Sequence, residues 1–123
     1  MNKVVTSAKT PKAVGPYSAG IVAADTVYIS GQLPLNAQGE MPETIEEQTR
    51  QSIENIKALL ESEGLSLSNV VKTTVFLSDI ADFVAMNGVY AEMFSAPFPA
   101  RSAFEVAALP KNAKVEIECI AHR

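Results

Sequence analysis

The chain has 123 residues, of which 47% are hydrophobic and 20% are charged, and this length and balance predict one soluble domain built around one core. A single cysteine and a single histidine exclude an internal disulfide and leave too few ligands for a zinc site, so we expect no metal. The formal net charge of −4 argues against a nucleic-acid partner, because phosphate-binding surfaces need clustered Lys and Arg.

Hydropathy and the N-terminus predict a cytoplasmic protein. No stretch approaches the roughly 20 uninterrupted apolar residues of a membrane span, so we expect no membrane partner. Residues 1–6 carry a charge without a following apolar segment, which predicts no signal peptide. No repeat, linker or low-complexity segment divides the chain, and residues 1–123 are expected to form a single domain.

Strands dominate the first third of the chain. Short strands are expected over residues 4–6, 20–23 and 26–30. The tight turn Ala24-Asp25 makes the last two a hairpin. Gly31 and Gln32 are then predicted to leave the sheet for a turn-rich loop.

An amphipathic helix is predicted to begin near Thr44. Thr44 and Glu47 have the spacing of a capping box, and Gly64 has the position of a left-handed stop. Apolar residues repeat at helical spacing between them, at Ile45, Ile53, Ile56, Leu59 and Leu60. One side of this helix should therefore pack against the rest of the molecule.

Residues 70–77 are β-branched or apolar on both alternating faces, which indicates a central strand. Strict alternation predicts that Val71 shares a face with Thr73, and that Val70 lies on the other face with Lys72.

A second helix and two strands complete the chain. Asp79 and Asp82 are predicted to open the helix, which ends before Pro97. Its stripe runs through Phe83, Asn87, Tyr90 and Phe94. The last strands are expected over residues 101–108 and 113–121, around a turn at residues 109–112.

This order of elements predicts an α+β fold with one sheet and two helices. The right-handed crossover rule places both helices on the same face of the sheet. The other face would then be bare, although the strand at residues 70–77 is apolar on both sides. A monomer would expose a large apolar surface, which a closed homo-oligomer would cover.

Arg101 is the first candidate for function. It follows a proline-stiffened segment and stands at the first position of a predicted strand. Its guanidinium offers a planar fork of donors that matches a carboxylate. Alternatively, Arg101 pairs with Glu116 or Glu118 across neighbouring strands, and the sequence patterns alone favour this structural ion pair.

Glu116 and Glu118 fall on one face of the last strand, and Cys119 falls on the other. A carboxylate on that face could orient or deprotonate a water as a general base, and a solvated strand face is the alternative. Cys119 is expected to be a buried, unreactive thiol because it faces away from both carboxylates.

Three further residues are candidates for a binding site. Asn87 interrupts an apolar helical stripe, so its amide needs partners, either in a pocket or, more simply, by capping a loop. Tyr17 lies on a loop, where binding residues are common, with ordinary packing as the alternative. Gly31 could let a ligand approach the backbone closely, or could serve a turn.

Several segments carry a specific family resemblance. They are Gly15-Pro16-Tyr17-Ser18, Ser30-Gly31-Gln32, Gln48-Thr49-Arg50-Gln51, Asn55-Ile56, Val71-Lys72-Thr73-Thr74-Val75-Phe76-Leu77, Asn87 with Tyr90, Pro99-Ala100-Arg101-Ser102 and Val115-Glu116-Ile117-Glu118. In these segments, and over nearly its whole length, the chain resembles the RidA-like branch of the Rid (YjgF-type) family. The resemblance implies a chorismate-mutase-like α+β fold and a homotrimer with a central barrel and clefts between subunits.

The resemblance also implies hydrolysis of 2-imino acids, such as 2-iminobutanoate and 2-iminopropanoate, and of their enamine tautomers. The products are 2-oxo acids and ammonia, and no cofactor is implied. By position, Arg101 corresponds to the residue that binds the substrate carboxylate and Glu116 to the residue that orients the water. Tyr17, Gly31 and Asn87 correspond to residues of the cleft.

The chain departs from the family at Ala103, where relatives commonly have a cysteine. The backbone N–H of Ala103 can still donate to the substrate, so this residue is kept among the binding residues. Any role for a thiol at this position is excluded.

Two other functions are alternatives to this activity. A non-catalytic module that senses 2-oxo acids would keep Arg101 without needing Glu116, so the presence of Glu116 favours the enzyme. An RNA-cleaving translation inhibitor is disfavoured by the acidic balance and by the lack of a His pair or a metal-binding carboxylate cluster.

Overall fold

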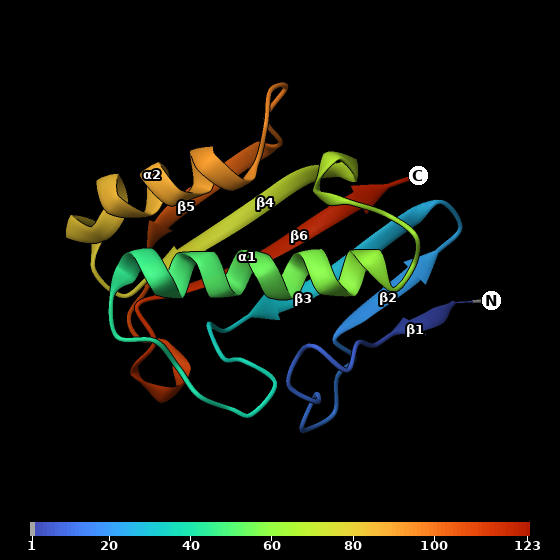
Figure 1. Ribbon diagram of the computed structural model, residues 1–123, viewed down its shortest axis with the longest axis horizontal. Helices are drawn as coiled ribbons and strands as arrows, with labels where there is room; N and C mark the ends of the chain where they lie inside the picture. The colour runs from blue at the N-terminus through green and yellow to red at the C-terminus, as the bar shows by residue number, and fades with distance from the viewer. Residues whose placement is uncertain (1) are drawn as a thin grey trace.

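The computed structural model describes residues 2–123 as one mixed sheet with two helices against it (Figure 1). The strands are β1 (Lys3–Val5), β2 (Gly20–Ala23), β3 (Thr26–Gln32), β4 (Val70–Leu77), β5 (Ala100–Glu105) and β6 (Val115–His122). The helices are α1 (Ile45–Glu61) and α2 (Phe83–Met93), and short 3-10 turns cover Leu67–Asn69, Ile80–Asp82 and Pro110–Asn112.

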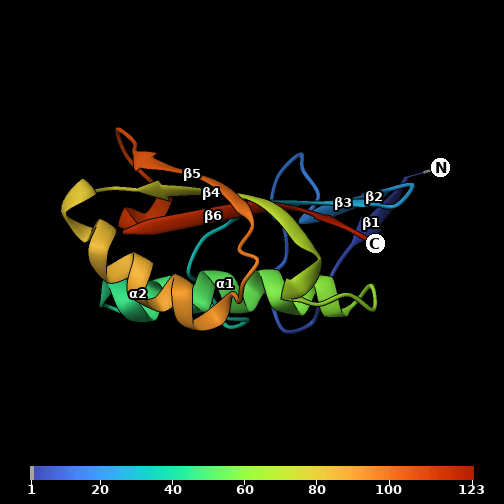
Figure 2. The ribbon, with the colours of Figure 1, turned by 90° about the horizontal axis from the view of Figure 1, so that it is seen from above.

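The six strands lie in the order β1-β2-β3-β6-β4-β5. All neighbours are antiparallel except β4 and β5, which are parallel and are connected through α2. Figure 2 shows α1 and α2 side by side on one face of the sheet, while the other face carries no helix. The predicted α+β class and the placement of both helices on one face are therefore confirmed.

The hydrophobic core fills the space between the sheet and the helices. Fully buried side chains come from both layers, among them Ile53, Leu59, Val75, Leu77 and Ile117. Burying an aliphatic side chain of this kind stabilises a fold by about 1.5–3 kcal/mol. The helix-covered face of the sheet is thus held by apolar packing.

Two buried polar residues of α1 fix two connecting segments of the chain. The Asn55 Nδ2 group donates to the carbonyl oxygens of Leu33 and Leu35 at 3.2 and 2.8 Å. The Gln48 side-chain oxygen accepts from the backbone N–H of Lys114 at 2.8 Å. These contacts anchor the loop after β3 and the entry to β6.

The ends of α1 agree with the sequence. Thr44 is the N-cap, and its hydroxyl accepts from the backbone N–H of Glu47 at 3.1 Å. Gly64 has a φ of 73°, the left-handed backbone conformation predicted for the stop.

Two predictions for the strands were wrong because the pairing register is irregular. Gly31 and Gln32 do not leave the sheet, since β3 continues to Gln32 with an irregular register between Ile29 and Gln32. A second irregularity lies between Val70 and Lys72 on β4. It leaves Val71 51% exposed and Val70 buried, which reverses the faces predicted for both.

The later elements also differ from their predicted bounds. Asp79 caps the 3-10 turn Ile80–Asp82, so α2 itself begins only at Phe83. The fifth strand ends at Glu105 instead of residue 108, and β6 begins at Val115 instead of residue 113. Lys111 and Asn112 have φ values of 58° and 57°, so the connection between these strands is a tight left-handed turn.

The hairpin turn between β2 and β3 gives a test of this local geometry. Ala23 pairs with Thr26, and Ala24, the first of the two turn residues, has a φ of 53°. A left-handed residue with a Cβ costs about 1–2 kcal/mol, more than the entropic cost of about 0.5–1 kcal/mol for glycine. We expect Ala24→Gly to raise the free energy of unfolding by about 0.5–1 kcal/mol in urea titrations.

Ala23→Gly is the matched control, because Ala23 is a strand residue without a positive φ. It should lower the free energy of unfolding. An Ala24→Gly variant less stable than the parent chain would contradict the strain assigned to the turn.

Candidate active site

Arg101 lies half-buried between β5 and α2. Its Nη1 donates to the side-chain oxygen of Asn87 at 2.6 Å. Its guanidinium carbon is 4.8 Å from the ring centroid of Tyr90 and 5.5 Å from that of Phe83. The guanidinium is therefore held on one edge by an amide and lies over aromatic rings, within the range of cation–π attraction.

No carboxylate of residues 2–123 lies within 4.0 Å of Arg101. The alternative that it pairs with Glu116 or Glu118 across neighbouring strands is wrong, because β4 lies between β5 and β6. A guanidinium has five N–H donors, and Asn87 accepts from one nitrogen only. The remaining donors can bind an anion.

Asn87 and Ala103 lie with Arg101. The Asn87 amide does not cap a loop, contrary to the simpler expectation, since its oxygen accepts from Arg101. Ala103 follows Arg101 by two residues on β5, is half-buried, and packs against the core beside Val75. We call Arg101, Asn87, Ala103, Tyr90 and Phe83 the Arg101 cluster.

Glu116 lies on β6 against the backbone of β3. A Cβ added to Gly31 would stand 2.8 Å from the Glu116 Oε2 atom, so a side chain at this position would displace the carboxylate from where it lies. Burial, and secondarily the charge of Glu118, raises the pKa of the Glu116 carboxyl. The close approach to Gly31 that the sequence suggested is thus made by a side chain of the same chain.

Tyr17 lies near Gly31. Both line a hollow of about 440 Å³ that also includes Lys12 and Lys111. The Tyr17 side chain is 55% exposed on its loop and does not pack in the core, which was the alternative interpretation. We call Tyr17, Gly31 and Glu116 the Glu116 cluster.

The two clusters lie on opposite faces of the sheet. Arg101 and Cys119 both align with Thr73 on β4, and this row faces the helices. Glu116 and Phe104 both align with Phe76, and this row faces away from the helices. Arg101 and Glu116 are also two strands and three residues apart, which amounts to about 10 Å in each direction.

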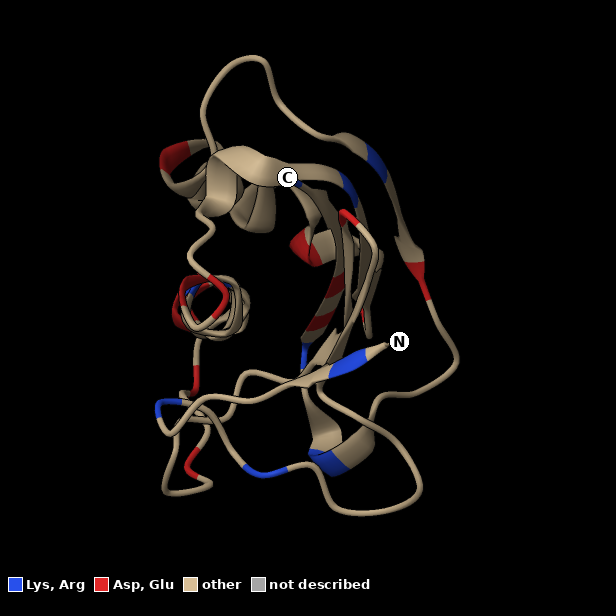
Figure 3. Cartoon of the chain, turned by 90° about the vertical axis from the view of Figure 1, so that its right-hand side faces the viewer, with Lys and Arg blue, Asp and Glu red and all other residues tan. Residues whose placement is uncertain are grey.

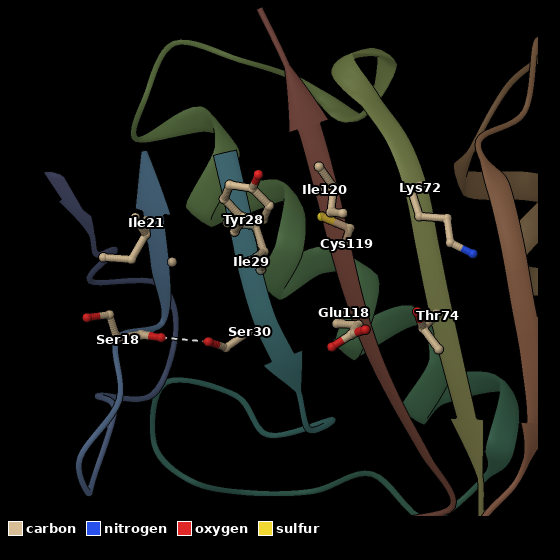
Figure 4. A pocket seen from close by; sticks show the side chains of 11 residues that line it. Ser18, Ile21, Tyr28, Ile29, Ser30, Lys72, Thr74, Glu118, Cys119 and Ile120 are labelled. Carbon is tan, nitrogen blue, oxygen red and sulfur yellow. Dashed lines mark hydrogen bonds between the residues drawn. The ribbon is translucent and has the colours of Figure 1, made fainter. Parts of the chain in front are cut away.

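The helix-free face carries a second hollow, of about 400 Å³. Figure 4 shows Glu118 of β6 beside Thr74 of β4, with Lys72 farther along β4 and Tyr28 on β3. The Tyr28 side chain is 49% exposed. This face therefore combines charged groups with exposed aromatic surface.

Cys119 does not belong to either cluster. It is 3% exposed and belongs to the core between the sheet and the helices, as the strand alternation predicted. Burial, together with the charge of Glu118, raises the pKa of the thiol to about 12, so it is protonated at neutral pH.

Phe83, Tyr90 and Thr73 have no site role predicted from the sequence. The Tyr90 hydroxyl lies 2.7 Å from the Thr73 hydroxyl, and both residues are buried. Phe83, Asn87 and Tyr90 are spaced by four and three residues on α2, and this spacing was visible in the sequence. The contacts with Arg101 show that this face of α2 surrounds the guanidinium.

Two features are absent from residues 2–123. No three His, Cys, Asp or Glu side chains are grouped so that they could hold a metal ion. Neither helix is long and apolar enough to cross a membrane.

Comparisons with known proteins match the whole fold. The family model described as Endoribonuclease L-PSP matches residues 7–123. A 2-iminobutanoate/2-iminopropanoate deaminase of Escherichia coli (strain K12) is 45% identical over 127 residues, covering 100% of this chain and 99% of that protein. The chloroplastic Reactive Intermediate Deaminase A of Arabidopsis thaliana is 50% identical, covering 97% of this chain and 65% of that protein.

A solved structure gives the same result in three dimensions. The crystal structure of E. coli TdcF with bound serine superposes with a TM-score of 0.95 at 42% identity, covering 98% of each chain. The resemblance seen in the sequence motifs is confirmed: the chain belongs to the Endoribonuclease L-PSP family, which includes these reactive-intermediate deaminases.

Proposed function

We propose that this protein hydrolyses 2-iminobutanoate, 2-iminopropanoate and their enamine tautomers to 2-oxo acids and ammonia. Full-length relatives named for this activity support the proposal at 45% identity. The observation that carries it is Arg101, a half-buried guanidinium that has aromatic and amide contacts but no carboxylate partner among residues 2–123. Such a group is suited to the carboxylate of a small substrate.

Arg101 binds the substrate carboxylate through two parallel hydrogen bonds. This contact fixes the adjacent imine carbon and removes much of its translational and rotational freedom before reaction. Ala103 contributes its backbone N–H, and Asn87 holds the guanidinium edge.

Glu116 orients a water toward the imine carbon. Protonation of the imine nitrogen makes that carbon electrophilic, the water oxygen adds to it and loses a proton, and a tetrahedral carbinolamine forms. The amine nitrogen takes up the proton that the added water gave up, the C–N bond breaks with both of its electrons going to nitrogen, and ammonia leaves. The carbinol oxygen then loses its proton to give the 2-oxo acid. The reaction adds one water and releases one ammonia without a change of oxidation state, so it requires no cofactor.

The proposal includes a homotrimer in which each active site lies between two subunits. The Arg101 and Glu116 clusters lie on opposite faces of one sheet, so one small molecule cannot contact both within a chain. The Glu116 cluster of one subunit would face the Arg101 cluster of the next, in a closed ring of head-to-tail contacts. The helix-free face and the exposed side chains Val14 and Tyr17 would be covered by neighbouring subunits.

A module that only senses 2-oxo acids remains the second candidate. The same Arg101 would bind such a ligand, but binding alone gives no reason for the half-buried Glu116 with its raised pKa. RNA cleavage is less well supported, although the family description refers to an endoribonuclease. Figure 3 shows that Lys and Arg are dispersed among different elements of the chain.

Generating the imines in the assay tests the activity directly. A pyridoxal-phosphate dehydratase acting on threonine or serine releases 2-iminobutanoate or 2-iminopropanoate, and 2-oxo acid formation is followed with and without this protein. We expect acceleration by the parent chain and a loss of about 10²-fold or more in kcat/KM for Arg101→Lys, because an ammonium cannot reproduce the planar fork. Unchanged rates with the parent chain, combined with tight binding of 2-oxobutanoate, would favour the sensing module.

Mixing inactive subunits tests the shared site. Arg101→Ala and Glu116→Gln chains should each be nearly inactive, and refolding them together in equal amounts should restore roughly a quarter of the parent activity in a head-to-tail ring. The reason is that half of the subunits supply an intact Arg101 and half an intact Glu116. No recovery in mixed oligomers, or a monomer mass by light scattering, would refute the intersubunit site.

The pH dependence tests the role of Glu116. Its carboxylate orients water in the ionised form, so kcat/KM should fall as the pH drops through its raised pKa. Glu118→Gln removes one of the two causes of that rise, and the acid limb should move to lower pH, whereas Glu118→Asp keeps the charge and should move it less. If the acid limb of Glu118→Gln lies at the same pH as that of the parent chain, ionisation of Glu116 does not cause the acid limb.

A further inference from the structure

Tyr90 lies directly against the guanidinium of Arg101 and is only 5% exposed. We propose that Tyr90, held in place by Thr73, is a positioning residue that fixes the plane of the Arg101 guanidinium and thereby its affinity for the substrate carboxylate. This inference rests on the proposed function, in which Arg101 binds that carboxylate.

The ring of Tyr90 is fixed from two directions. Its hydroxyl lies 2.7 Å from the Thr73 hydroxyl, and Thr73 is fully buried. Thr73 is also the residue of β4 that aligns with Arg101 of β5. The ring of Phe94 packs beside the ring of Tyr90, with centroids 4.5 Å apart and planes tilted by 34°. Thr73, which aligns with Arg101, therefore also holds the Tyr90 ring against the guanidinium.

This arrangement reduces the freedom of a long side chain. An unrestrained arginine loses rotamer entropy when it is ordered, and that cost would fall on substrate binding. Here Asn87 holds one edge of the guanidinium and Tyr90 supports its face. The fork is thus ordered before the carboxylate arrives, which strengthens binding.

Tyr90 supports Arg101 as a neutral phenol. Burial raises the pKa of Tyr90, although the hydrogen bond to Thr73 and the charge of Arg101 oppose the rise. A phenolate would pair with Arg101 and compete with a substrate anion. The neutral ring supports the cation without neutralising it.

Three variants test the proposal: Tyr90→Leu removes the ring, Tyr90→Phe keeps it without the hydroxyl, and Val89→Ala truncates a buried neighbour on the same helix. The measurements are KM and kcat for 2-iminobutanoate generated in situ, the Kd for 2-oxobutanoate, and the thermal midpoint. Tyr90→Leu should raise KM and Kd about tenfold, with a smaller change in kcat, since the carboxylate is held alike in the ground and transition states. Tyr90→Phe should raise them about threefold or less.

Thr73→Val removes the same tether from the other strand. The double variant Thr73→Val with Tyr90→Phe should have a KM no higher than that of the more impaired single variant, because both substitutions delete the same interaction. Additive losses would contradict a tether between the two hydroxyls.

The outcomes separate this inference from the proposed function. If the parent chain is active, Arg101→Lys is impaired and Tyr90→Leu keeps the KM of the parent chain, the positioning role of Tyr90 is overturned and the proposed function stands. The positioning role would also be overturned if Val89→Ala raised KM as much as Tyr90→Leu at the same loss of thermal midpoint, because general destabilisation would then explain the increase in KM. A parent chain that hydrolyses no imine would overturn the proposed function and this inference with it.

Discussion

The alternation of side chains across β4 is the constraint on which the rest of the molecule depends. Thr73 and Phe76 are three residues apart, so their side chains point to opposite faces of the sheet. Thr73 aligns with Arg101 of β5 and Phe76 aligns with Glu116 of β6, so Arg101 and Glu116 also lie on opposite faces. No rotamer change can bring these groups together, because a pleated sheet separates them. Chemistry that needs both therefore requires a second chain, and the helix-free face is available for it.

Local sequence patterns predicted much of the fold. Thr44 and Gly64 bounded α1 correctly because caps and left-handed stops depend on a few neighbouring residues. The faces of Val70 and Val71 were wrong because the irregular register that reverses them is set by pairing with β6, some 50 positions away in the sequence. The prediction that Gly31 leaves the sheet was wrong for a similar reason, since β3 continues through this residue with an irregular register against β6.

The candidate site was predicted residue by residue but not in its arrangement. Arg101, Glu116 and Asn87 were identified by residue type and motif, and the structure brings Asn87 to Arg101. The separation of Arg101 from Glu116 depends on the position of β4 between β5 and β6, which no local pattern contains. Tyr90 and Phe83 look like ordinary core residues in the sequence, and only their contacts with the Arg101 guanidinium show what they support.

The central place of β6 also has a consequence for how the chain acquires its structure. The sixth strand in sequence lies between the third and the fourth in space, so β3 and β4 each expose an unpaired edge until β6 has been synthesised. Each half of the sheet gains its main long-range pairing only from this strand, which makes folding a late and cooperative event that local contacts cannot complete. The same strand carries Glu116, so a chain that has assembled its sheet has, in that one step, also installed its proposed water-orienting carboxylate.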